Sequence, residues 1–76
     1  LFFKQLNFII MNILALLDNL NFSNISGFFF NDGALIIRFN WDLSLMQFKQ
    51  IAAEIENLKP TEVDVFFDEF KIIVKN

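Results

Sequence analysis

Three residue types that often carry chemistry are missing from this 76-residue sequence: cysteine, histidine and tyrosine. Without cysteine, the chain can form neither a disulfide bond nor a thiolate metal site. Without histidine, it lacks the most common general base and zinc ligand near neutral pH. The two glycines, Gly27 and Gly33, are too few for a phosphate-binding loop. We therefore predict a protein that is not an enzyme, with no catalytic residues, no cofactor and no metal.

Basic residues are scarce as well. Six lysines and arginines stand against nine aspartates and glutamates, which gives a net charge of −3. Proteins that bind nucleic acid usually carry clustered basic residues, and here they are scattered, so we predict no nucleic-acid binding. Asp64, Asp68 and Glu69 lie close together and would suit a hard cation such as Mg²⁺. We interpret them instead as a solvated turn and an outward-facing strand residue.

The sequence has no apolar run that is long enough to span a membrane. The run at residues 6–17 has only twelve residues and includes Asn7 and Asn12, whereas a spanning helix needs about 20. No small-residue cleavage site of the kind that ends a signal peptide follows it. We interpret this run as part of an amphipathic helix and predict a cytoplasmic protein.

What the chain has in excess is apolar side chains. Hydrophobic residues make up 55% of the sequence, and twelve of them are phenylalanine. We expect residues 1–76 to form one domain, and a domain this small buries only about 60% of its unfolded surface. Some apolar side chains must then lie at the surface, where large patches usually mark a partner. A homo-oligomer is the simplest such assembly.

Two segments have the hydrophobic periodicity of amphipathic helices, residues 2–20 and residues 44–58. In the first, Phe8 and Met11 lie in the middle of the polar arc, where they are either scattered surface hydrophobes, which are common, or a contact stripe. In the second, Ser44 and Gln47 have the spacing of a capping box. Pro60 then stops that helix.

A hairpin is predicted on either side of the second helix. In the first, Asp32-Gly33 is typical of a two-residue type I′ turn, which places Phe29 opposite Ile36. The second spans residues 62–75 and pairs Phe66 with Lys71. We expect a two-residue turn at Asp68-Glu69 there, with a four-residue turn as the alternative.

The element order is therefore αββαββ, which indicates an α+β fold. The halves at residues 1–41 and 42–76 resemble each other, because residues 12–21 align with residues 50–59 and each helix precedes a phenylalanine-rich strand. We interpret this as a tandem αββ repeat. Two hairpins and two helices most simply make one four-stranded antiparallel sheet with both helices on one face.

The predicted pairing assigns each strand residue to one face of the sheet. The open face would carry Phe29, Ile36, Phe66 and Ile73, and Trp41 would extend this patch. The face under the helices would carry Phe28, Phe30, Leu35, Ile37, Phe39, Val63, Val65, Phe67, Phe70, Ile72 and Val74.

We interpret the chain as a small non-enzymatic interaction module. It would self-associate or dock on a protein partner through the open sheet face, or through Phe8 and Met11. The alternative is a small acidic inhibitor, of the kind that phages and mobile elements encode, which blocks a protein such as a nucleic-acid enzyme. Its candidate acidic residues are Asp64, Asp68, Glu69, Glu54 and Glu56. A stable homodimer favours the module, and tight binding to a nuclease favours the inhibitor.

Overall fold

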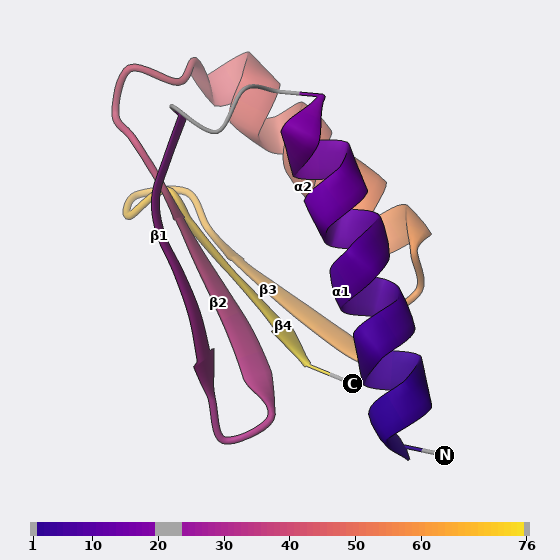
Figure 1. Cartoon of the computed structure of the whole chain (residues 1–76). Coiled ribbons are helices and arrows are strands. Elements are labelled where there is room, and N and C mark those ends of the chain that lie inside the picture. Colours follow the sequence, from indigo (N-terminus) through magenta and orange to yellow (C-terminus); the bar gives the residue numbers. More distant parts are fainter. Residues whose placement is uncertain (1, 20–23, 76) are drawn as a thin grey trace.

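Two helices cover one face of a four-stranded antiparallel sheet, and the other face is open (Figure 1). The computed structural model describes residues 2–19 and 24–75, with side chains described for residues 8–19 and 24–75. The predicted α+β class and αββαββ order are confirmed. In chain order the elements are α1 (Phe2–Asp18), β1 (Ile25–Asn31), β2 (Ala34–Phe39), α2 (Leu45–Asn57), β3 (Glu62–Phe66) and β4 (Lys71–Lys75).

Helix α1 ends at Asp18, two residues earlier than predicted. Its apolar residues Ile9, Ile13 and Leu17 recur every fourth position, so they share one face of the helix. All three are buried in the common core. The predicted positions of the side chains of residues 2–7, and the part of the connection at residues 20–23, lie outside the described residues.

Helix α2 begins with the predicted capping box. The Ser44 hydroxyl accepts a hydrogen bond from the Gln47 N–H at 3.1 Å, and the Gln47 side chain accepts one from the Ser44 N–H at 3.2 Å. After Asn57 the backbone turns left-handed at Lys59, with φ of 57°, and Pro60 prevents the helix from continuing. The buried stripe is Phe48, Ile51, Ala52 and Ile55.

The first hairpin has the predicted turn and the predicted register. Asp32 and Gly33 have φ of 51° and 76°, the two positive values that a type I′ turn requires. Phe29 lies opposite Ile36, as predicted. The side-chain faces of β1 and β2 are therefore those that the sequence indicates.

The second hairpin has the predicted strand register but a different turn. Four residues, 67–70, separate the strands, so the two-residue turn at Asp68-Glu69 is wrong and the four-residue alternative is right. A type I′ turn needs positive φ at two successive residues, which non-glycine residues seldom adopt. The longer turn places Phe70 in that conformation, with φ of 49°.

The strand order in the sheet is β1-β2-β4-β3. The second strands of the two hairpins meet in the centre, where Ile36 lies opposite Ile73 and Ile37 opposite Ile72. The first strands, β1 and β3, consequently form the two edges. This arrangement is compatible with the predicted tandem repeat, which remains a prediction.

The core lies between the helices and the two central strands, and one part of the predicted inner face is wrong. Phe28 and Phe30 in β1 are 37% and 51% exposed, and Phe67 is also exposed. Phe28 and Phe30 point to the helix side of the sheet, but from its edge, away from the central strands. Phe67 lies in the turn rather than in β3. The buried sheet residues of the core are Leu35, Ile37, Phe39, Ile72 and Val74, with Phe70 from the turn and partly buried Val63 and Val65 beside them.

An aromatic cluster fills one end of the core. Phe48, which is fully buried, stacks on Phe70 with ring centroids 4.9 Å apart. Phe39 and Phe67 each meet Phe48 edge to face at 5.6 Å, and Trp41 stacks on Phe70 at 4.9 Å. Contacts of this kind add to the stabilisation from burial. They hold Phe70 in a backbone conformation that is otherwise unfavourable for a bulky residue.

Candidate interaction surface

The open face of the sheet is the first candidate surface. The cross-strand register arranges its side chains in rows that run across β1, β2, β4 and β3. The middle row is Phe29, Ile36, Ile73 and Asp64. The fourth predicted patch residue, Phe66, lies in the next row, so the structure brings all four patch residues onto one face.

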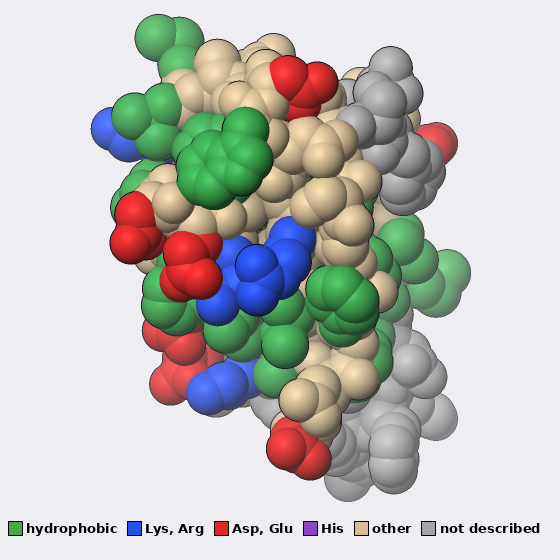
Figure 2. Space-filling view, turned by 90° about the vertical axis from the view of Figure 1, so that its left-hand side faces the viewer, with side chains coloured by type: hydrophobic (Ala, Val, Ile, Leu, Met, Phe, Trp, Pro, Cys, Tyr) green, Lys and Arg blue, Asp and Glu red, His purple; other side chains and the backbone are tan. Residues whose placement is uncertain are grey.

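The row that contains Phe66 also brings two cations together, since Arg38 lies directly opposite Lys71. The Lys71 Nζ lies 4.6 Å from the centroid of the Phe66 ring and 3.5 Å from the Glu69 carboxylate. Figure 2 shows this face, with Lys and Arg side chains near the centre, hydrophobic side chains around them and acidic side chains toward several of its margins. Like charges opposite each other repel, so Arg38 and Lys71 are better left in solvent than buried together.

The row at the other end joins the two strands of the second hairpin. The Lys75 Nζ lies 3.1 Å from the Glu62 carboxylate. The hydrogen bond to Glu62, together with the charge of Glu62, raises the pKa of Lys75. The β3 side of the open face is therefore lined with charged groups.

Exposure of the patch residues is uneven. Ile36, Phe66 and Ile73 are partly buried, whereas the Phe29 side chain is 51% exposed. The Phe29 ring lies against Gly27, where an ideal Cβ would come within 2.6 Å of a ring carbon. Only glycine leaves room for the ring in this position. The most accessible apolar part of the open face is thus its β1 margin.

Strand β1 carries exposed phenylalanines on both of its faces. Phe29 points to the open face, and its neighbours Phe28 and Phe30 point to the helix side. No residue of β1 is charged, because its sequence is ISGFFFN. The sequence pattern does not identify Phe28 and Phe30 as surface residues, because local periodicity does not encode strand order, which decides which strand is an edge.

The remaining predicted site residues, Phe8, Met11 and Trp41, are all exposed. Phe8 and Met11, at 69% and 70%, are on α1, on the opposite side of the sheet from the open face. Trp41 follows β2 and is 70% exposed, with its ring stacked on Phe70. Two further exposed apolar residues, Leu45 and Met46, were not predicted; they lie in the first turn of α2, outside its buried stripe.

The acidic residues do not gather on one surface. Asp64 is on the open face of β3, whereas Glu54 and Glu56 are on α2, across the sheet. Within the part of the chain that the structure describes, no three His, Cys, Asp or Glu residues could hold a metal ion together. This distribution provides no support for a surface that mimics nucleic acid.

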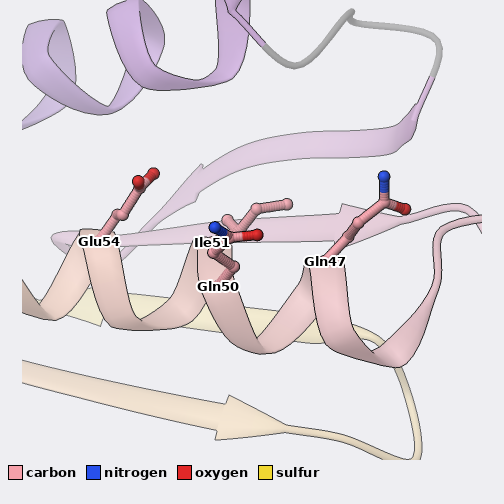
Figure 3. Close-up of a pocket in the computed structure, with 4 residues that line it drawn as sticks. All are labelled: Gln47, Gln50, Ile51 and Glu54. Carbon is pink, nitrogen blue, oxygen red and sulfur yellow. The ribbon is translucent and has the colours of Figure 1, made fainter.

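One pocket lies along α2, with a volume of about 170 Å³. Figure 3 shows its lining residues on the side of the helix toward α1. The lining is Gln47, Gln50, Ile51 and Glu54. It offers two amides and a single carboxylate, which do not form a pair of acid and base groups.

Comparison with known proteins gives no significant match to a family model, to a curated protein or to a solved structure. Neither helix, over the residues described, is both long and apolar enough to cross a membrane.

Proposed function

We propose that this protein is a non-enzymatic protein–protein interaction module that self-associates into a homo-oligomer. One observation carries the proposal: three consecutive phenylalanines, Phe28, Phe29 and Phe30, are solvent-exposed on the two faces of one uncharged strand. Contact between water and an aromatic side chain is unfavourable, and burial of that surface stabilises the complex by about 25 cal/mol for each Å² removed from solvent. Exposed apolar patches of this kind typically mark an interface.

A second copy of the chain is the partner that suits this surface. A two-fold interface places the same patch of each copy against the other, and the run of three identical residues is complementary to itself. Because β1 has no charged side chain, two copies meet there without repulsion between like charges. Packing two open faces together would instead bury Arg38 together with the Lys71–Glu69 ion pair, and removing charged groups from water is costly.

The size of the surface indicates weak to moderate affinity. Together, the exposed fractions of Phe28, Phe29 and Phe30 amount to rather more than one whole phenylalanine side chain, or roughly 200–350 Å² per copy. A standard interface takes about 800 Å² from each partner. We therefore expect association in the micromolar range, with neighbouring residues adding to the contact.

The oligomeric state in solution tests the proposal. Light scattering on the purified chain should show the mass rising from monomer toward dimer or higher as the concentration rises through the micromolar range. Phe8→Glu provides a control that should associate as the wild type does, because Phe8 is more exposed than the β1 phenylalanines but lies on α1. A constant monomer mass over the whole range would overturn self-association.

A further inference from the structure

We infer that β1 of one copy pairs antiparallel with β1 of a second copy, so that two four-stranded sheets join edge to edge into one continuous sheet. The inference deepens the proposed function and rests on it. Strand β1 is an edge of the sheet, and in Figure 1 none of the described helices and strands lies beside it on its outer side. An edge strand presents unpaired N–H and C=O groups that can bind another strand.

The backbone of β2 shows which groups of β1 point outward. The Phe39 N–H donates to the Phe70 carbonyl at 2.9 Å, so Phe39 directs its backbone toward the β4 side. Residues in an antiparallel strand alternate in direction, and Ile36 therefore directs its backbone toward β1. Ile36 lies opposite Phe29, so the N–H and C=O groups of Phe29 point toward β2.

Phe28 and Phe30, on either side of Phe29, consequently direct their N–H and C=O groups away from the sheet. A second β1 strand can use both sets of groups when Phe28 of one copy lies opposite Phe30 of the other. Phe29 then lies opposite its own counterpart on the two-fold axis. This register places phenylalanine against phenylalanine at all three positions, and such cross-strand aromatic pairs are stabilising.

The neighbouring registers are less favourable. A shift of two residues in one direction places Phe30 opposite Ser26, which lies at the irregularity between Ile25 and Gly27 where the β1 register shifts. A shift in the other direction places Phe28 opposite Asp32, which belongs to the turn. A shift by an odd number of residues would place a helix-side residue of one copy opposite an open-face residue of the other. In the inferred register, both helix layers lie on the same side of the joined sheet.

Two substitutions separate edge pairing from face-to-face packing; Phe66→Lys in addition removes the ring that lies beneath the Lys71 ammonium, so the fold of each variant is checked. Phe29→Lys and Phe66→Lys each place a cation on the open face of an edge strand, the first on β1 and the second on β3. Edge pairing predicts that Phe29→Lys weakens association roughly 10-fold or more, as for a central aromatic anchor, while Phe66→Lys leaves it unchanged. Circular dichroism should show that each variant is folded.

The other outcomes each have a definite meaning. If both substitutions weaken association equally, or if only Phe66→Lys does, the contact is on the open face and edge pairing is wrong, although self-association stands. If the wild-type chain still associates and neither substitution weakens it, another surface is used and edge pairing is again wrong. A monomeric wild-type chain overturns both proposals.

A backbone substitution tests the inference without removing any side chain. A chemically synthesised chain with N-methylphenylalanine at position 30 loses one outward N–H and gains a methyl group on the free edge. We expect this chain to keep the fold and to lose association. In the wild type, hydrogen exchange at the amides of Phe28 and Phe30 should slow as the concentration rises. Edge pairing would be overturned if the N-methylated chain still associates. It would also be overturned if the exchange rates of these amides stay the same as the wild type goes from monomer to dimer.

Discussion

Strands β1 and β3 are the two edges of one sheet, but they expose different groups to solvent. Strand β3, with sequence EVDVF, has five residues, two acidic side chains and partly buried valines. Strand β1, with sequence ISGFFFN, has seven residues, no charge and three exposed phenylalanines. Short length and charged side chains are the usual means by which proteins keep an edge strand from pairing with another chain. Strand β3 has both features and β1 has neither.

The difference extends to the way each edge is held. On the β3 side, Phe67 follows the strand and contacts Phe48 in the aromatic cluster. On the β1 side, Phe28 and Phe30 point toward the helix layer but stay exposed. Phe67 is itself 47% exposed, so what distinguishes it is the edge-to-face contact of its ring with Phe48, and not how much of its surface lies in solvent. This comparison indicates that phenylalanine content alone does not identify the core.

The largest effect should come from removing a phenylalanine at the centre of the aromatic cluster. Phe48→Ala should lower the free energy of unfolding by about 3–5 kcal/mol, because it leaves a large cavity among Phe39, Phe67 and Phe70. Phe30→Ala should cost only about 1 kcal/mol, since roughly half of this side chain is already in water.

Urea denaturation at a concentration where the chain is monomeric measures both changes. Equal losses for Phe48→Ala and Phe30→Ala would contradict the contrast between the two regions, because they would place Phe30 in the core of the monomer.

A smaller effect should distinguish the contribution of the Phe70 ring to stability from that of its backbone conformation. Both Phe70→Ala and Phe70→Gly remove the ring that stacks on Phe48 and Trp41. At a φ of 49°, however, glycine avoids a penalty of about 1 kcal/mol that alanine retains. The glycine variant should therefore unfold at higher urea concentration than the alanine variant. The opposite order would show that the second turn does not hold Phe70 in the left-handed conformation.

Much of the fold follows from local patterns in the sequence. The capping box at Ser44 and the turn at Asp32-Gly33 depend on residues only a few positions apart, and both are confirmed. Each hairpin register then follows from its turn and from the alternation of apolar residues. The error in the second turn is of the same local kind, because the sequence did not indicate that Phe70 would adopt a positive φ.

The candidate surface was harder to predict, for a physical reason. Alternation assigns Phe28 and Phe30 to the helix side correctly, but burial depends on how far the helices extend across the sheet. That extent, like the strand order β1-β2-β4-β3, depends on contacts between residues far apart in the sequence, and short sequence patterns do not predict it. The open-face position of Phe29 was predictable, whereas the exposure of its two neighbours was not.

The smallest effect concerns the charged edge. The Glu62 carboxylate, 3.1 Å from the Lys75 ammonium, raises the pKa of Lys75 by its hydrogen bond and its charge. A raised pKa means that folding favours the protonated lysine, so the stabilisation is complete below the unfolded value of about 10.4. It is lost as the pH rises through the higher pKa of the folded state. Both groups are about half exposed, so salt should weaken the effect. Glu62→Gln should lower the pKa of Lys75 in an NMR titration and leave self-association unchanged, since the pair lies on the β3 side. An unaltered pKa would mean that Glu62 does not pair with Lys75 in solution. A loss of association would show that the interface involves the β3 edge and not the β1 edge.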